Sequence, residues 1–321
     1  KKLKLQPEIE HILQRTFGND VSISCFGGTP CVHQKAVIQI YRNSKILGYC
    51  KVARSQDVGY LFDKECENLN YLREKSVDSI PEVLFRCDLD DLKLFCQSSV
   101  KDKSGQTIDR MTEKHWLFLA NLYNKTRTVI KFEETDYYAL LKRVKKNAVV
   151  LKETDLEIVQ RACELISKKY NNSTVEFGFY HGDFTPWNTV IENGKIKVFD
   201  FEYAKRTYPP YLDAVHYLLQ KNFFVDGLND ANQIYSSLKE SSIWKKFDDR
   251  RSLEMVIMYL LEIINLYLSR TSEESLDEKS RQKIRIEILK RVYRRQGNEK
   301  SFAESDHRIY SYLFVYRHVF I

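Results

Sequence analysis

The feature that most limits what this chain can form is a segment just past mid-chain, residues 179 to 202. Asn193-Gly194 lies inside it, between two stretches in which apolar and polar residues alternate. Asn-Gly is the strongest short signal for a two-residue β-hairpin turn, because both turn residues must adopt positive φ. A hairpin around this turn brings its entry residue, Asn188, close to its exit residue, Asp200.

The polar residues at the two ends of this hairpin are of the kind that bind magnesium. Asn188 and Asp200 offer two hard oxygen ligands, which leaves room for water and phosphate around the metal. Asp183 lies five residues before Asn188, in the turn that leads into the hairpin. Phosphoryl transfer needs one carboxylate that orients a hydroxyl and takes its proton, and an Asn and a second Asp that hold metal. We therefore expect Asp183 to be catalytic and Asn188 and Asp200 to bind metal.

The run from residue 181 to 188, His-Gly-Asp-x-x-x-x-Asn, is followed by Val-Phe-Asp at 198 to 200. Together they resemble the motif of the aminoglycoside phosphotransferase and choline kinase superfamily. The Asp-to-Asn spacing equals that of the protein-kinase catalytic loop, although this loop begins His-Gly-Asp instead of His-Arg-Asp. The resemblance implies a two-lobed α+β kinase-like fold, with ATP and Mg²⁺ as cofactors. GTP is an open alternative, because the hinge backbone that meets the base cannot be read from sequence.

The pattern of the first hundred residues fits the small lobe of such a fold. Runs of β-branched and aromatic residues separated by turns predict strands within residues 21–53 and 82–97. Between them, apolar residues that recur every three or four positions predict a helix over residues 60–75. We expect a nucleotide-binding lobe over residues 1–99. A mostly helical lobe, with the catalytic loop and the acceptor site, is expected over residues 100–321.

The resemblance also implies which residues of the small lobe hold the phosphates. Lys51, in an apolar strand run, matches the lysine that holds the α- and β-phosphates. Glu65 matches the helix glutamate that orients this lysine, and Glu67 is the alternative partner. Gly27-Gly28 lies where the phosphate-covering loop belongs, although such a pair is also typical of an ordinary turn.

Four further residues complete the expected site. The backbone near Gln97 and Ser98 would meet the base, because this strand resembles the last one before the hinge. His181 is expected to form structural hydrogen bonds in the loop. Asp213 resembles a family aspartate that braces the catalytic loop, but it is equally well explained as a helix cap.

The composition bears on partners and on location. The formal charge of +7 is mild for 321 residues and does not by itself indicate nucleic acid binding. The longest apolar run is too short to span a bilayer, so no membrane contact is expected. Seven cysteines without a C-x-x-C pattern suggest reduced core residues in a cytoplasmic protein. We expect a monomer or a weak dimer.

The acceptor is expected to be the hydroxyl of a small molecule. Only twelve residues separate Asp200 from Asp213, and no Ala-Pro-Glu closes a protein-kinase activation segment. Three acceptor classes stay open. An aminoglycoside would need acidic side chains, an anionic sugar or phosphate could use the basic segment 281–295, and a choline-like cation would need an aromatic cage. The candidates for the acidic pocket are Glu202, Asp213, Asp226, Asp230 and Glu262, and those for the cage are Tyr203, Tyr208 and Tyr211.

Two other classes of function compete with a small-molecule kinase. The first is a kinase-like module that binds nucleotide without catalysis, which the presence of Lys51, Asp183, Asn188 and Asp200 disfavours. The second is a basic nucleic acid binder, for which no recognised module is present. Nucleotide-titrated melting curves and ATP turnover distinguish the first, and salt-sensitive binding to DNA or RNA would indicate the second.

Overall fold

The computed structural model describes residues 6–27, 35–101, 105–270 and 276–299, with side chains described up to residue 296. Its helices are α1 (Pro7–Phe17), α2 (Gln56–Glu74), α3 (Glu113–Thr126), α4 (Asp136–Asn147), α5 (Glu153–Tyr170), α6 (Leu212–Phe224), α7 (Ala231–Glu240), α8 (Ser242–Lys246), α9 (Asp249–Leu268) and α10 (Leu276–Glu299), with short 3-10 helices η1 (Phe132–Glu134) and η2 (Ala148–Val150). Its strands are β1 (Ser22–Gly27), β2 (Ala36–Arg42), β3 (Lys45–Ala53), β4 (Val83–Leu89), β5 (Leu92–Ser98), β6 (Thr128–Lys131), β7 (Thr174–Tyr180), β8 (Thr189–Glu192), β9 (Lys195–Val198) and β10 (Lys205–Tyr208).

The chain divides into two compact units that are not continuous in sequence. The first unit comprises residues up to 126 together with 179–206 and 216–226, and the second comprises 127–178, 207–215 and the residues from 227 onward. The expected catalytic loop, residues 181–188, and the hairpin that follows it therefore belong to the same unit as the N-terminal sheet. The lobe boundary expected at residue 99 stays a prediction.

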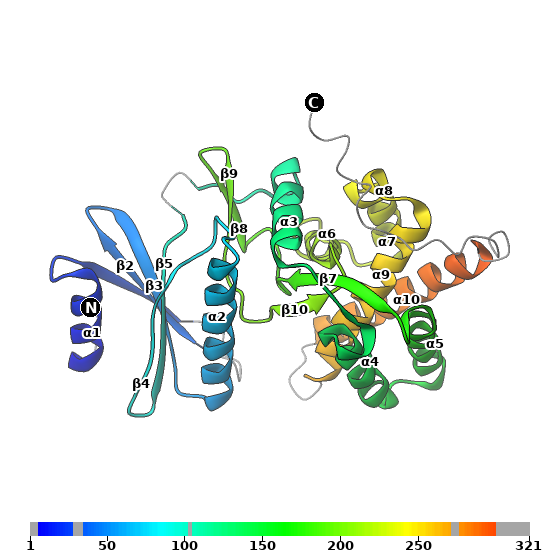
Figure 1. The fold of residues 1–321 in the computed structure, drawn as a ribbon, viewed down its shortest axis with the longest axis horizontal. Coiled ribbons are helices and arrows are strands. Elements are labelled where there is room, and N and C mark those ends of the chain that lie inside the picture. Colours follow the sequence, from blue (N-terminus) through cyan, green and yellow to red (C-terminus); the bar gives the residue numbers. More distant parts are fainter. Residues whose placement is uncertain (1–5, 28–34, 102–104, 271–275, 300–321) are drawn as a thin grey trace. The chain divides into compact units, whose positions relative to one another are not determined.

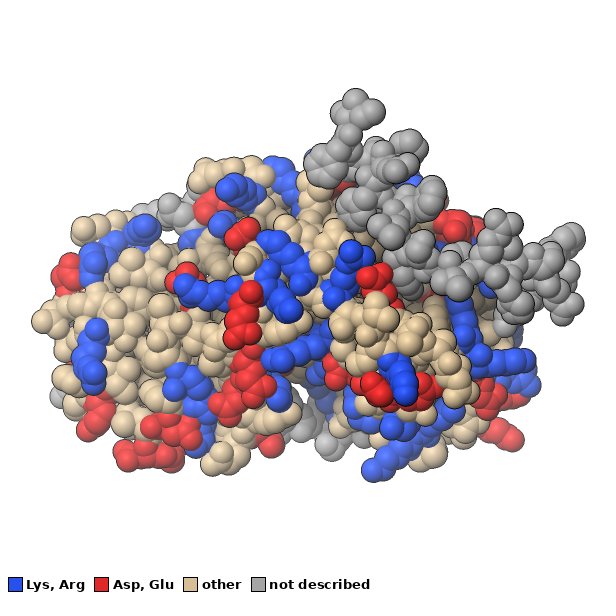
Figure 2. All heavy atoms as spheres, viewed as in Figure 1, with Lys and Arg blue, Asp and Glu red and all other residues tan. Residues whose placement is uncertain are grey.

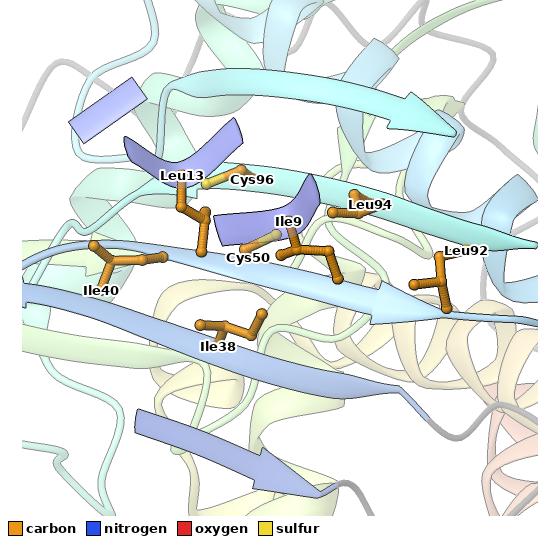
Figure 3. Packing of buried hydrophobic residues seen from close by; sticks show 8 residues of the cluster. All are labelled: Ile9, Leu13, Ile38, Ile40, Cys50, Leu92, Leu94 and Cys96. Carbon is orange, nitrogen blue, oxygen red and sulfur yellow. The ribbon is translucent and has the colours of Figure 1, made fainter. Parts of the chain in front are cut away.

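The first unit is built on a five-stranded antiparallel sheet with the order β1-β2-β3-β5-β4. Alternate residues of a strand point to opposite faces, so each face has its own apolar set. Helix α1 covers one face, where Ile9 and Leu13 pack against side chains from β2, β3 and β5 (Figures 1 and 3). The buried members of this cluster are Ile9, Leu13, Ile38, Ile40, Cys50, Leu92, Leu94 and Cys96.

The opposite face of the sheet carries helix α2. Phe62 of α2 lies against Phe95 of β5, with ring centroids 6.1 Å apart. Lys51 is paired with Phe95 across the β3–β5 ladder, so it shares this face, whereas its neighbour Cys50 lies in the α1 cluster. The helix begins at Gln56, four residues before the predicted start at residue 60. The period of two in β3 thus directs Lys51 toward the helix that carries Glu65.

The second unit is mostly helical around a small sheet of order β10-β7-β6. Helix α9 is buried on nearly all sides, as its run of apolar residues from Met255 predicts, and it packs against α4 and α10. Much of the basic segment 281–295 is engaged in ion pairs. The pairs are Arg281–Glu278, Arg285–Glu278, Lys290–Asp155, Lys290–Glu287 and Arg295–Asp249.

The predicted α+β fold class is confirmed, since the antiparallel sheet occupies the N-terminal part and helices dominate the rest. Among the helices that the structure describes, none is long and apolar enough to cross a membrane. The described cysteines are all free thiols. On the face drawn in Figure 2, Lys and Arg side chains lie interspersed with Asp and Glu.

Candidate active site

The hairpin that the Asn-Gly turn predicted is formed by β8 and β9. Asn193 and Gly194 adopt φ of 49° and 76°, the positive values that this turn needs. Thr189 lies opposite Val198, and the Phe199 N–H donates to the Asn188 carbonyl oxygen at 3.2 Å. Antiparallel pairing therefore extends past the strand ends, and it places Asn188 beside the segment that carries Asp200.

Both carboxylate oxygens of Asp183 are held by hydrogen bonds. Asn188 Nδ2 donates to Asp183 Oδ2 at 2.7 Å and to its main-chain oxygen at 3.0 Å. His216 Nε2 lies 3.2 Å from Asp183 Oδ1. His216 comes from helix α6 and is 2% exposed. Sequence reasoning missed this residue, and its position three residues after Asp213 was the only signal.

His181 is a buried, neutral hydrogen-bonding residue. The Asp183 N–H donates to its Nδ1 at 3.1 Å, so the proton lies on Nε2, which is 3.1 Å from the Phe199 carbonyl oxygen. Burial lowers the pKa of His181 to about 4, although Asp183 and Asp200 raise it in part. The imidazole thus links the start of the catalytic loop to the strand that ends at Asp200.

Glycine at position 182 is required by the backbone. Gly182 has φ of 84°, and a Cβ there would lie 2.6 Å from the Tyr203 carbonyl oxygen. A residue with a side chain is therefore disfavoured here for two reasons: the Cβ atom would clash, and L-residues rarely adopt this positive φ. This explains the His-Gly-Asp sequence, in contrast to His-Arg-Asp.

Lys51 joins the sheet, helix α2 and the end of the hairpin. Its Nζ lies 2.5 Å from Glu65 Oε2 and 2.6 Å from Asp200 Oδ1. Glu67 instead pairs with Lys64 on the exposed side of α2, at 2.8 Å. Helical periodicity separates the two glutamates, because residues two apart on a helix point to different sides. The structure thus places Glu65 at the lysine.

Burial and charge shift the ionisation of these three groups. Burial lowers the pKa of Lys51, but the carboxylates of Asp200, Glu65 and Glu202 outweigh this effect and hold it well above its usual range. Burial raises the pKa of Glu65 to about 7, against the opposing charge of Lys51. Burial also acts to raise the pKa of Asp200, yet Lys51 and Lys35 hold it well below its usual value.

Asp200 itself is in a left-handed backbone conformation, with φ of 73°. Non-glycine residues are uncommon there, and such strain concentrates at functional sites. Asn68 of α2 donates to the carbonyl oxygen of the next residue, Phe201, at 3.1 Å and so fixes this turn. This hydrogen bond from helix α2 therefore helps to hold Asp200 in its left-handed conformation.

Two charged residues that the motif did not indicate complete the site. Lys35 Nζ lies 2.5 Å from Glu202 Oε2 and 3.8 Å from Asp200 Oδ1. Glu202 is 8% exposed, and its Oε2 is 3.9 Å from Lys51 Nζ. The contact partners are 149 to 167 residues apart in the chain, so local sequence patterns carry no signal for them.

The carboxylates of this cluster suit a divalent cation. Ligand oxygens of Glu65, Asp200 and Glu202 all lie within 4.8 Å of one another. Hard oxygen donors are those that Mg²⁺ prefers. Glu65 is fully buried, and its Oε1 has no hydrogen-bond partner among the described residues. The chemistry of this donor set therefore fits the metal that the resemblance implies.

A pocket lies beside Lys51 in the first unit, with strand β5 along one side. Gln97 and Ser98, which were expected near the base, both line it, and Gln97 Oε1 is buried without a hydrogen-bond partner among the described residues. The lining residues are Lys35, Val37, Tyr49, Lys51, Pro81, Gln97, Ser98, Val100, Lys101, Phe199 and Asp200.

The remaining expected site residues are Gly27, Gly28 and Asp213. Gly27 ends β1 in an exposed position, and a Cβ there would meet nothing within 4 Å. Gly28 lies outside the described residues. Asp213 is buried in the first turn of α6 and belongs to the second unit, so its bracing role stays a prediction.

Aromatic residues of the loop differ in their environment. Phe184 is fully buried and stacks on Phe118, with ring centroids 6.0 Å apart. Trp187 is 42% exposed and packs edge-on against Phe224, which is 48% exposed. Phe184 is thus a core residue, whereas Trp187 presents much of its ring to solvent.

Solved structures share this fold at low sequence identity. Aminoglycoside phosphotransferase APH(4)-Ia, a thermostable mutant in ternary complex with ADP and hygromycin B, matches with a TM-score of 0.57 and 13% identity over 89% of this chain and 98% of that chain. The GDP and kanamycin complex of APH(2")-IIia matches with a TM-score of 0.53 and 16% identity over 90% of this chain and 99% of that chain. A candidate fructosamine-3-kinase from Haemophilus somnus 129PT matches with a TM-score of 0.52 and 12% identity over 88% and 96% of the two chains.

No family model matches the sequence, and no curated protein matches it. The structural likeness nevertheless confirms the kinase-like fold that the catalytic-loop motif predicted.

Proposed function

We propose that this chain is a Mg²⁺- and ATP-dependent phosphotransferase that moves the γ-phosphate to a hydroxyl of a small molecule. The observation that carries the proposal is the connected set of polar contacts in the first unit. Lys51 pairs with Glu65 and Asp200, and Asn188, at the entry of the hairpin whose exit leads to Asp200, holds Asp183. Kinases need this combination of a phosphate-binding lysine, metal-binding oxygens and a carboxylate that faces the acceptor.

Each residue has a role that follows from its contacts. Lys51 would bind the α- and β-phosphates, and Glu65 would keep its ammonium group oriented. Asn188 and Asp200 would hold the metal, since Asn188 uses its side-chain N–H groups on Asp183 and its side-chain Oδ1 accepts no hydrogen bond among the described residues. Mg²⁺, when bound, supplies charge neutralisation on the transferred phosphate.

Asp183 would orient the acceptor hydroxyl and take its proton. His216 and Asn188 each donate to one oxygen of its carboxylate, so the group is fixed in position before the acceptor binds. An ordered carboxylate loses less orientational freedom at the transition state, which favours in-line attack on the phosphate. The acceptor hydroxyl can still approach the remaining lone pairs of the Asp183 carboxylate without displacing His216 or Asn188.

The connection after the metal-binding segment supports a small acceptor. The chain passes from Asp200 through the short strand β10 to α6, which begins at Leu212. A protein kinase uses a longer segment here to bind a peptide. The related folds whose structures contain acceptors hold hygromycin B and kanamycin, which are small hydroxyl-rich molecules.

The three acceptor classes are not equally supported by local contacts. The residues suggested for an acidic pocket are all engaged in contacts: Glu202 pairs with lysines, Asp226 pairs with Lys221, Asp230 caps α7, Glu262 accepts from Tyr208, and Asp213 also has an interaction partner. Tyr208 is fully buried, so it cannot face a choline-like cation. A direct assay decides which acceptor class is used and whether the phosphate donor is ATP or GTP.

The test is a coupled ADP-release assay with a panel of acceptors: hygromycin B, kanamycin, a fructosamine, choline and sugar phosphates. Each is measured with ATP and with GTP, in Mg²⁺ and in chelator. We expect Mg²⁺-dependent release that one acceptor class stimulates and that Asp183→Asn lowers by about 10²- to 10⁴-fold. Nucleotide binding in calorimetry without any acceptor-stimulated release would favour the non-catalytic module. The absence of any nucleotide binding would refute the proposal.

A further inference from the structure

Two lysines in the site share the same two carboxylate oxygens. Lys51 Nζ and Lys35 Nζ both lie within 4 Å of Asp200 Oδ1, at 2.6 Å and 3.8 Å, and of Glu202 Oε2, at 3.9 Å and 2.5 Å. The two positive and two negative groups therefore alternate around one small ring. The mechanism above uses only Lys51, so the second ammonium group needs its own explanation.

The two lysines differ in how firmly they are held. Lys51 lies in the middle of β3, its side chain is 7% exposed, and Glu65 provides a third carboxylate contact. Lys35 immediately precedes β2, its side chain is 22% exposed, and its ion pairs among the described residues are only those to Glu202 and Asp200. Lys35 is therefore the ammonium group that can leave the cluster at the lower cost.

A divalent cation and Lys35 would compete for these oxygens. Asp200 and Glu202 belong to the set of hard oxygen donors that fits Mg²⁺, and Lys35 contacts one oxygen of each. With Glu65, Asp200 and Glu202 ionised, the cluster carries one excess negative charge while Lys35 is present and two when it has left. The Lys35 ammonium group and a divalent cation repel each other when they are a few ångströms apart, so binding of both to the same carboxylates at once is disfavoured.

We propose that Lys35 is a positioning residue that occupies the metal's place on Asp200 and Glu202 in the nucleotide-free protein. When metal and nucleotide enter together, Lys35 moves from the carboxylates to the phosphates, whose negative charge replaces its lost partners. Lys35 lines the same pocket as Gln97 and Ser98. A nucleotide whose base lies near these two residues would therefore place its phosphates near Lys35. Metal binding then depends on nucleotide. This inference rests on the proposed function for the identity of the displacing ligand.

The test measures metal binding without nucleotide and without turnover. Mn²⁺ is titrated into the nucleotide-free protein, and the free ion is followed by electron paramagnetic resonance. We expect weak binding in the wild type and affinity tighter by about ten- to a hundredfold in Lys35→Met, because a competing charge is removed. Lys35→Arg keeps the charge and should bind Mn²⁺ as weakly as the wild type. Lys35→Gln provides a second neutral variant.

The matched control is Lys101→Met. Lys101 lines the same pocket but lies over the rings of Tyr49 and Phe199, at 5.9 Å and 5.4 Å, with no carboxylate partner among the described residues. Its loss should leave nucleotide-free Mn²⁺ affinity unchanged. Adding Glu202→Gln to Lys35→Met should return the affinity to a weak value, which assigns the metal to this cluster.

The proposal would be overturned if both neutral Lys35 variants bound Mn²⁺ no more tightly than the wild type. It would also be overturned if Lys101→Met gained as much Mn²⁺ affinity as Lys35→Met. Calorimetry with MgATP separates this result from the proposed function. Lys35→Met should bind MgATP more weakly and Mn²⁺ alone more tightly. These opposite changes are expected only if the Lys35 ammonium group contacts the carboxylates in the free protein and the phosphates in the complex. If the wild type binds no nucleotide, the kinase proposal fails, whereas the competition between Lys35 and metal is still decided by the Mn²⁺ titration.

Discussion

His216 Nε2 lies 3.2 Å from Asp183 Oδ1, whereas Asn188 donates to the other carboxylate oxygen, Oδ2. His216→Ala should lower kcat by about ten- to a hundredfold, because a misplaced base loses part of the assistance that a positioned one gives. Nucleotide affinity should stay unchanged, and His216→Asn should recover part of the rate by restoring a donor. Steady-state kinetics with the identified acceptor checks this, with the exposed His11→Ala as control. A similar loss in His216→Asn and His216→Ala would argue against positioning by hydrogen bond.

Asp183→Asn and Asp200→Asn should fail in different ways. Asp183→Asn should bind MgATP nearly as the wild type does and lose transfer by about 10²- to 10⁴-fold, since it removes the proton acceptor. Asp200→Asn should lose Mg²⁺-dependent nucleotide binding as well, because it removes a proposed metal ligand that also pairs with Lys51. Single-turnover rates and calorimetry on both variants make the comparison. Near-normal transfer by Asp183→Asn would contradict the central proposal.

Lys51→Met should reduce both nucleotide binding and stability. The change leaves the buried Glu65 carboxylate without its cation, and breaking such a pair typically costs about 3 to 5 kcal/mol. Chemical denaturation of Lys51→Met measures that loss. Lys51→Met/Glu65→Gln should recover part of it, because the second change removes the unpaired charge. Glu67→Gln, on the exposed side of the same helix, should be silent in both measurements.

The acid sensitivity of folding should depend on His115. Burial lowers the pKa of His115 to about 4, and its Nδ1 accepts from the Thr112 N–H at 3.1 Å, so the neutral ring is the folded form. Between pH 6.5 and 4 the unfolded chain therefore binds more protons, and stability falls as the pH falls. His115→Gln should make this slope shallower by about 1.4 kcal/mol per pH unit, the value of one proton. Urea denaturation at several pH values measures the slope in the wild type and in His115→Gln.

Gly182→Ala should distort the catalytic loop, because its Cβ would lie 2.6 Å from a backbone oxygen at positive φ. The left-handed conformation alone costs an L-residue about 1 to 2 kcal/mol. We expect a lower melting temperature and a larger loss of transfer than of nucleotide binding. Gly27→Ala is the matched control, since nothing lies within 4 Å of its Cβ. Equal melting temperatures for the two variants would show that the loop can adapt.

The local Asn-Gly signal predicted the hairpin, whereas the family resemblance implied the contact of Glu65 with Lys51. The Asn193-Gly194 turn depends only on the conformational preference of its own residues, and helical periodicity separates Glu65 from Glu67 in the structure. Helix α1 was not predicted, because only Ile9 and Leu13 are buried along it and its packing surface is the sheet. The strands β6 and β10 were also missed, because each is four residues long and is defined by pairing in a three-stranded sheet.

The electrostatic part of the site could not be predicted in the same way. Lys35 and Glu202 are 167 residues apart, and charged residues in loops are usually solvated. His216 meets Asp183 through the packing of α6 beside the catalytic loop, which no local pattern encodes. Motif spacing therefore predicts which groups would react, whereas the residues that contact them become visible only in three dimensions.

Gly182 has a consequence for how such an enzyme could be controlled. Many protein kinases wait for a phosphorylated segment to dock on arginine side chains before they become competent. The residue before Asp183 has no side chain, and the backbone of Tyr203 fills the space that one would need. The catalytic loop thus carries no guanidinium at this position to receive such a signal. Any control of this kind would therefore have to act through another part of the chain.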